Sequence, residues 1–537
     1  MAILSQTLSS STAAAIRIMY MIPALFIMLL LTVFFFIAYE LFAIFVPKTT
    51  HNHNRNHSSP GSIAALLKPT SGCRSKLGEL LQSRALANER LRCTFQLTNT
   101  FVSADPTIHS TFVRQMNALI SKRRGGGHST SDHQEWLDFL QVARGAVASQ
   151  LNSPQSSTAA SKSCASCGDS GRSCGEAFNS PFAEFIQLLT LKVIIAGLLD
   201  PDRDMDSIDG EDLRVSAKLI TELWGKSKTP PPPSTTSSLD EAYFPSDLKV
   251  LKYHLRRLLP NEESYPNPID FVIPTWETLW RLVATSLAHV HENEEYRQVF
   301  ESLLEEPSYR QYRGLGLGDD SRTTESDAYP LIPESPMCAE WIINETLRLH
   351  PPSRHISRGF LGESDEANRT PFLRVLTAFA AKVIPRSIVQ WVRHTNVSER
   401  SSASASSHLR LTVTEVADIE SVHLSTQIWG ADARMFNPRR WAVRAEGKVA
   451  LTTTNDESGK TEPPVFFTFG HGRLACIGEK WAPMAAATII AAVLEGIKVD
   501  GLEIVGTSHI GGRTGWDGWM IHPRGQPSPE ILKDARI

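Results

Sequence analysis

Cys476 lies in a segment whose residue types and spacing could support metal chemistry. Gly470 and Gly472 precede it, and an alanine-rich apolar run over residues 481–497 follows and predicts a helix. A thiolate near a helix N-terminus is stabilised by the helix dipole and by unpaired backbone N–H groups. Glycines let the backbone approach a flat, bulky ligand, and Phe469 can lie against the face of such a ligand. Haem is one such ligand and accepts a proximal cysteine thiolate, whereas a buried structural cysteine is the alternative interpretation.

This segment resembles the cysteine loop of the cytochrome P450 family, whose pattern is F-G-x-G-x-R-x-C-x-G. The matching residues are Phe469, Gly470, Gly472, Cys476 and Gly478. The family's arginine reaches a haem propionate, but Leu474 occupies its place here and Arg473 stands one position earlier. The resemblance implies that Cys476 ligates the haem iron, and that Arg473 or another basic group holds the propionate.

Two further motifs resemble the same family. Glu345 and Arg348 share one face of a predicted helix that ends at Pro351-Pro352, as in the family's E-x-x-R-L-x-P-P. Residues 436–441 resemble its F-x-P-x-R-[F/W]. The resemblance implies that Arg440 locks onto the Glu345–Arg348 pair and places one carboxylate between two guanidiniums. That role holds the fold together and takes no part in chemistry.

A long apolar helix is predicted over residues 269–290, with Pro274 inside it. Proline removes one backbone hydrogen bond, so we expect a kink. Glu277 and Thr278 match the acid–alcohol pair of the family's A-G-x-[D/E]-T, while proline and threonine replace the alanine and glycine. The resemblance implies that Glu277 and Thr278 deliver protons to O₂. A surface pair on a kinked helix is the alternative.

Three basic residues are further candidates for the haem propionates. His109 and Arg114 lie on a helix predicted over residues 105–120, in the region where the resembled family directs basic residues toward the propionates. Arg358, like Arg354, follows the double proline and could replace the missing arginine. A solvated helix face is the competing interpretation for His109 and Arg114.

The composition is that of an ordinary globular protein with an ample core. The chain has 537 residues, 42% hydrophobic and 21% charged, with a net charge of -3 and no basic stripe that would suggest nucleic acid. Its seven cysteines have irregular spacing, which fits a reducing compartment better than a disulfide framework. Cys164, Cys167 and Cys174 lack a visible fourth zinc ligand, so we interpret them as part of a loop.

The N-terminal region predicts a membrane anchor. No charge occurs from Ile18 to Tyr39, and the apolar run continues past Glu40 to Val46, without the small-residue cleavage site of a signal peptide. Positive residues are more frequent after this run than before it, which places the rest of the chain on the cytoplasmic side. The predicted organisation is an anchor at 1–46, a polar tether at 47–62 and one haem-thiolate domain at 63–537.

Local patterns predict several other elements. They are helices at 75–92, 182–199 (buried in the core), 213–224 and 247–259, a helix that begins at Ser335-Pro336, a solvated insertion at 363–408, and a terminal hairpin of 502–505 with 516–521. The resemblance implies a mostly α fold with small β-sheets, the cytochrome P450 fold, preceded by one transmembrane helix.

The function that the resemblance implies is monooxygenation. Haem b would be the cofactor, and one atom of O₂ would enter a lipophilic small molecule. Electrons would come from NADPH through a membrane-bound flavoprotein reductase, because the chain has no nucleotide motif of its own. The pattern resembles the fungal microsomal branch, which implies the endoplasmic reticulum membrane, contact with lipid, and secondary metabolites such as terpenoids or polyketides. A reductase-independent isomerase or dehydratase and a non-catalytic anchored binding protein remain as alternatives.

Overall fold

The structure is a computed structural model, and it describes residues 54–70, 75–122, 132–152, 178–228, 245–314, 336–361, 412–445 and 465–525. These residues belong to a unit that begins at Asn54, and a separate unit comprises Met1–His53. The predicted anchor, the first part of the tether, the cysteines at 164, 167 and 174 and the insertion at 363–408 lie outside the described residues.

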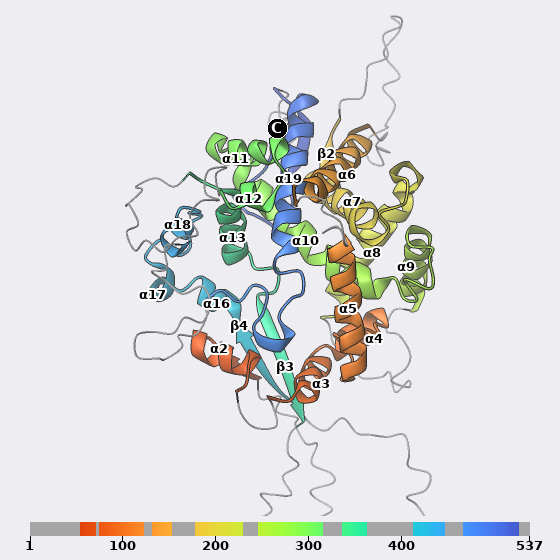
Figure 1. Cartoon of the computed structure of the whole chain (residues 1–537), viewed down its shortest axis with the longest axis vertical. Helices are drawn as coiled ribbons and strands as arrows, with labels where there is room; N and C mark the ends of the chain where they lie inside the picture. Colours follow the sequence, from red (N-terminus) through yellow and green to blue (C-terminus); the bar gives the residue numbers. More distant parts are fainter. Residues whose placement is uncertain are drawn as a thin grey trace, which may run out of the picture. The chain divides into compact units, whose positions relative to one another are not determined.

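The described residues are mostly helical, with short strands between the helices (Figure 1). The helices are α2 (Pro60–Leu67), α3 (Leu77–Ala87), α4 (Glu89–Phe95), α5 (Pro106–Lys122), α6 (Asp132–Asn152), α7 (Phe182–Ile194), the π-helix η2 (Ile195–Leu199), η3 (Met205–Ser207), α8 (Gly210–Lys226), α9 (Pro245–Leu258), α10 (Ile269–Val290), α11 (Glu294–Glu305), α12 (Tyr309–Tyr312), α13 (Ala339–Leu349), α16 (Ile419–His423), α17 (Thr426–Trp429), α18 (Arg440–Ala445), η5 (Gly472–Leu474) and α19 (Trp481–Val499). The strands are β1 (Asn54–His57), β2 (Ser180–Pro181), β3 (His355–Leu361), β4 (Thr412–Asp418), β5 (Leu502–Val505) and β6 (Met520–Pro523).

Two small sheets accompany the helices. In the first, β4 lies between β1, to which it is parallel, and β3, to which it is antiparallel. In the second, β6 pairs antiparallel with both β2 and β5, in the register Leu502↔Pro523 and Val505↔Met520. A mostly α chain with small sheets agrees with the expected fold class, and the terminal hairpin forms with its second strand at 520–523.

The core lies where α10 and α19 pack on α6, α7 and α13. Trp276 and Trp280 of α10 are fully buried. The alanines of α19 let neighbouring helices approach closely, and a Cβ on Gly496 would collide with Val147 of α6. The segment Phe182–Leu199 and helix α19 are long and apolar enough to cross a membrane, but most of each lies inside the fold, as expected of core helices.

The structure differs from the expected element bounds at three places. The segment 54–62, expected as tether, contains β1 and the start of α2, because the backbone of a polar strand pairs with β4 regardless of its side chains. The predicted helix at 75–92 is divided at Asn88, whose side chain donates to the Phe101 carbonyl at 3.1 Å. Helix α13 begins after Cys338, whose side chain makes no capping bond, and not at Pro336.

Candidate functional site

The loop before α19 has a backbone that only its glycines can adopt easily. Gly470 and Gly472 have φ angles of +77° and +75°, in the left-handed region. A Cβ on Gly472 would lie 2.8 Å from the Cβ of Lys68, so a side chain there would also collide with the end of α2. The Cys476 amide closes the loop by donating to the Phe469 carbonyl at 2.8 Å. Helix α19 then begins at Trp481, a short turn after the cysteine.

The Cys476 side chain is exposed, yet burial raises the pKa of its thiol above the usual range. A side chain can be exposed and still have a raised thiol pKa when it faces an open space that protein atoms surround. The backbone N–H of Gly478 partly opposes this increase in pKa by favouring the thiolate. Such a thiol ionises readily only beside a cation, and a bound metal ion is the strongest cation available in a protein.

Arg84 of α3 and Arg358 of β3 are more than nine-tenths buried and lie near each other. Burial, and for Arg84 also the positive charge of Arg358, lowers the pKa of each to about 10. The Nε atom of each has no hydrogen-bond partner, and no carboxylate pairs with either in the part of the chain that the structure describes. Buried guanidiniums need an anion, so these two fit a carboxylate ligand.

The arginine pair adjoins the cysteine loop and one of the predicted basic residues. Ile356 stands two residues before Arg358 on the same face of β3, and its Cδ1 would be 3.7 Å from a Cβ on Gly470. Arg84 Nη2 donates to the Thr100 carbonyl at 2.6 Å, and the Thr100 hydroxyl is 2.8 Å from His109 Nδ1. The structure thus brings His109 and Arg358 to one cluster with Arg84.

Two other predicted propionate ligands lie elsewhere. Arg114 is exposed on α5, and Arg473 is exposed on η5. Neither makes a hydrogen bond or ion pair with the Arg84–Arg358 pair within the described ranges. Arg114 and Arg473 therefore do not belong to the Arg84–Arg358 cluster, and their role as propionate ligands stays a prediction.

The three predicted fold-holding residues meet in a fully connected ion-pair cluster. Arg348 binds both oxygens of Glu345 at 2.8 and 2.9 Å, and Arg440 Nε donates to Glu345 Oε1 at 2.9 Å. Glu345 and Arg348 have no exposed surface. Asp432 provides a second carboxylate, 2.9 Å from Arg440 Nη2. Trp441 Nε1 donates to Glu345 Oε2 at 3.0 Å, so the whole motif 436–441 is fixed to α13.

Glu277 of α10 is buried and ion-paired to two arginines. Arg281 Nη2 is 3.0 Å from its Oε2, and Arg513 Nε donates to its Oε1 at 2.7 Å. Both oxygens therefore act as acceptors. Thr278, the next residue, is half-buried, and the structure records no hydrogen bond for its hydroxyl, so only Thr278 of this pair has a hydroxyl proton ready to donate.

Helix α10 continues through Pro274, and the carbonyl that this proline leaves unpaired is that of Asp270. Asn99 Nδ2 donates to that carbonyl at 2.9 Å. The Asp270 carboxylate in turn accepts from the Thr98 amide at 2.9 Å and from the Thr98 hydroxyl. The segment before α5 is therefore fastened to the helix at the position of the proline.

Sequence reasoning missed Arg84, Asp432, Arg281 and Arg513. Arg281 could have been found, because it stands one helical turn after Glu277 and such pairs interact. Arg84 and Arg513 act across long sequence separations, and no local pattern marks them. Asp432 stands only eight residues before Arg440, but no motif marks it.

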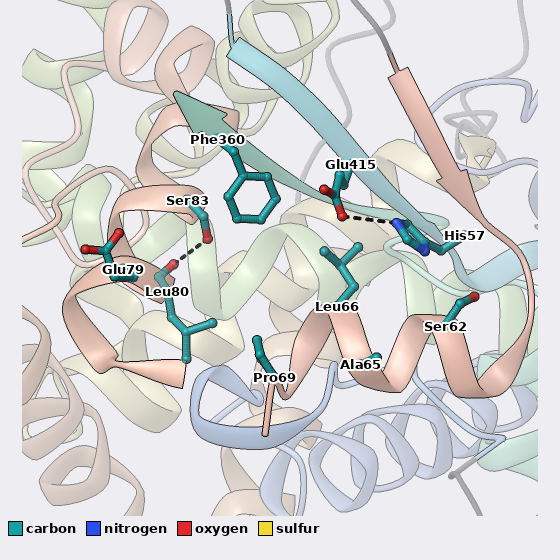
Figure 2. Close-up of a pocket in the computed structure, with 10 residues that line it drawn as sticks. All are labelled: His57, Ser62, Ala65, Leu66, Pro69, Glu79, Leu80, Ser83, Phe360 and Glu415. Carbon is teal, nitrogen blue, oxygen red and sulfur yellow. Dashed lines mark hydrogen bonds and ion pairs between the residues drawn. The ribbon is translucent and has the colours of Figure 1, made fainter. Parts of the chain in front are cut away.

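A separate pocket of about 290 Å³ lies between α2, α3 and the first sheet (Figure 2). On its rim His57 Nε2 is 3.2 Å from Glu415 Oε2. None of the predicted site residues lines this pocket, so it is distinct from the cysteine loop.

A sequence model of the family described as Cytochrome P450 matches residues 416–506. The chain is 32% identical over 74 residues (14% of each chain) to "Cytochrome P450 monooxygenase ptmK" of Penicillium ochrochloron. It is 36% identical over 77 residues (14% of this chain, 12% of the relative) to "Cytochrome P450 734A5" of Oryza sativa subsp. japonica. It is 28% identical over 154 residues (29% of this chain, 20% of the relative) to "Cytochrome P450 CYP749A22" of Panax ginseng.

These matches span a fifth or less of the length of each relative. The residues matched by the family model nevertheless contain the end of β4, the Arg440 motif, the Cys476 loop and α19. The motif at 345–348 lies outside that match and joins it in space through the Glu345–Arg440 ion pair. Over residues 416–506 the chain is therefore similar to the cytochrome P450 family, and the connected motifs and the mostly helical fold agree with that similarity.

Proposed function

We propose that this chain is a haem-thiolate monooxygenase that inserts one atom of O₂ into a lipophilic small molecule. One observation carries the proposal: Cys476 stands in a glycine-shaped loop beside two buried arginines whose Nε atoms have no partner. A soft sulfur ligand and a pair of unbalanced cations are complementary to the iron and the propionates of haem b.

The residues of this chain would divide the binding of the haem among them. The Cys476 sulfur would ligate the iron, Arg84 and Arg358 would hold the propionates, and His109 would support them through Thr100. Phe469 and the two loop glycines would lie along the porphyrin. When bound, the haem supplies an electron-rich iron that activates O₂.

The acid–alcohol pair has unequal roles in this proposal. The Thr278 hydroxyl delivers protons at the reaction site. Glu277 accepts hydrogen bonds from Arg281 and Arg513, so it orients the helix and the C-terminal loop around Thr278. We propose further that electrons come from NADPH through a reductase, and that an N-terminal anchor holds the domain at the cytoplasmic face of the endoplasmic reticulum.

A carbon-monoxide difference spectrum of the reduced full-length chain tests the proposal. We expect the red-shifted Soret band of a thiolate-ligated haem, and we expect Cys476→Ser to abolish it. Cys93→Ser, at a half-buried cysteine on α4, is the matched control and should keep the band. A chain that binds no haem, or a Cys476→Ser variant with an unchanged band, would refute the proposal.

The proton role of Thr278 has its own test. Thr278→Ala should uncouple NADPH consumption from product formation and increase peroxide release. Thr275→Ala is the matched control, because the Thr275 hydroxyl is already bound to the Phe271 carbonyl at 2.7 Å. Equal coupling in both variants would reject the role of Thr278.

A reductase-independent isomerase or dehydratase is the second candidate. Glu277 is ion-paired to Arg281 and Arg513, so its carboxylate is occupied as an acceptor. This favours an isomerase or dehydratase, because neither reaction needs a proton delivered to O₂. Turnover of an oxygenated substrate without NADPH would support this candidate over the monooxygenase.

A further inference from the structure

Arg281 and Arg513 bring more positive charge to α10 than Glu277 can balance. Their side chains are each 13% exposed, and that of Glu277 is 3% exposed, so all three are largely removed from water. Two guanidiniums share one carboxylate at this position. The arrangement resembles an anion site in which the protein has provided only part of the negative charge.

Trp224, near the end of α8, has two guanidiniums close to its indole ring. Arg513 Cζ is 4.5 Å from the centre of the indole ring, and Arg90 Cζ is 6.0 Å from it. Arg90 Nη1 also donates to the Ser227 hydroxyl at 2.7 Å. The aromatic ring and the hydrogen bonds to Ser227 and Glu277 hold these two arginines in defined positions. A ligand would bind the N–H groups that those bonds leave over.

Lys228 completes the group, which we call the Trp224 cluster: Arg90, Trp224, Lys228, Arg281 and Arg513 around Glu277. Burial and the positive charges of Arg513, Arg90 and Arg281 lower the pKa of Lys228, and only Glu277 raises it. Four cations and one carboxylate leave a net charge of +3 among these described side chains. Like charges repel, so a bound anion would stabilise the cluster.

We propose that the Trp224 cluster binds the carboxylate of an amphipathic organic acid, whose apolar part extends along α10 toward Thr278. The proposal rests on the proposed function, since it names the substrate class for that same site. Three observations favour a small acid as the occupant. Arg281 and Arg513 are too enclosed for a macromolecule to reach, Glu277 is the direct neighbour of Thr278, and planar guanidiniums match a carboxylate in two-point contact.

The test compares an acid with its uncharged ester on the purified full-length chain. Dodecanoate and methyl dodecanoate differ in charge and share the same alkyl chain. Binding is measured by isothermal titration calorimetry, below the micelle concentration of the acid, and in parallel by the shift of the Soret band. We expect the acid to bind about tenfold more tightly than the ester, because hydrogen bonds to a charged group are worth roughly one decade or more in affinity.

The variant Arg90→Gln/Lys228→Gln should reduce this preference to about threefold or less, because it removes two cations without touching Glu277 or Thr278. Arg214→Gln, an exposed arginine on α8 that pairs with Glu211, is the matched control and should keep the full preference. Equal affinities of acid and ester for the unmodified chain would overturn the inference. A preference that persists in the double variant would also overturn it.

Failure of this anion-site inference can be distinguished from failure of the proposed function. A chain with the thiolate Soret band and no preference for the acid is a haem-thiolate protein without this anion site. A chain without haem still reports by calorimetry whether the cluster selects dodecanoate. A double variant that loses binding to anionic vesicles and keeps its preference for dodecanoate would reassign the cluster to the membrane surface and overturn the inference.

Discussion

Two buried arginine clusters in this chain differ in how their charges are balanced. In the first, Arg348 and Arg440 face Glu345 and Asp432, and Arg348 also donates to the carbonyl of His423 at 2.7 Å. In the second, Arg84 and Arg358 meet no carboxylate among the described residues, and each keeps one Nε atom unpaired.

The difference shows which cluster folding completes and which one needs a ligand. A charge-balanced network is satisfied as soon as its elements pack, and it then resists any change that removes one partner. Two like charges held in a dry environment cost stability until an anion arrives. The first cluster therefore belongs to the architecture of the domain, and we propose that the second binds a ligand.

A substitution that breaks the balanced cluster should change the free energy of unfolding most. Glu345→Gln leaves two buried guanidiniums without their shared charge, so we expect a loss of about 3–5 kcal/mol in the free energy of unfolding. Urea denaturation of the full chain measures it. Glu340→Gln on the same helix, whose ion pair with Arg313 is partly exposed, should cost less than about 1 kcal/mol. Similar losses for the two variants would contradict the assigned role.

Removing a cation from the unbalanced pair should have opposite effects on the two forms of the protein. Arg358→Met should stabilise the haem-free chain by about 1–3 kcal/mol, because it removes an unsatisfied buried group. The same change should accelerate haem loss about tenfold or more. Haem transfer to apomyoglobin and urea denaturation measure the two effects. Arg214→Met, at an exposed arginine of α8, is the control, and a less stable haem-free Arg358→Met would show that Arg358 is already satisfied.

Acid should reduce the free energy of unfolding by a smaller amount, through two histidines near the balanced cluster. His289 and His350 share a hydrogen bond of 3.0 Å, and burial first, then nearby positive groups, lowers their pKa values to about 3 and about 4. The unfolded chain binds protons at these positions below about pH 6.5 and the folded chain does not, so stability falls as pH falls.

Between pH 6.5 and 5.5 this loss should be about 1 kcal/mol per histidine. His289→Gln should flatten the dependence of the unfolding free energy on pH, while His509→Gln, at an exposed position, should leave it unchanged. An identical slope for wild type and His289→Gln would refute this origin of acid sensitivity.

The sequence predicted the balanced cluster better than the unbalanced one, for a physical reason. Glu345, Arg348 and Arg440 belong to patterns with fixed local spacing, and α10 has its predicted bounds because apolar residues occupy most of its circumference. The sequence did not predict a role for Arg84, because its neighbour Arg358 lies on a strand far along the chain and no local pattern marks the contact. Arg513 was missed in the same way, and with it the ion-paired state of Glu277.

The bond between Asn99 and the Asp270 carbonyl makes the local shape of α10 depend on a residue outside that helix. A substitution at Asn99 would free that carbonyl and let the first turns of α10 relax, which would shift Thr278 without altering any residue near it. The shape of α10 thus has a determinant outside the helix, and if the proposed oxygen chemistry holds, Asn99 belongs beside Thr278 among the positions to vary.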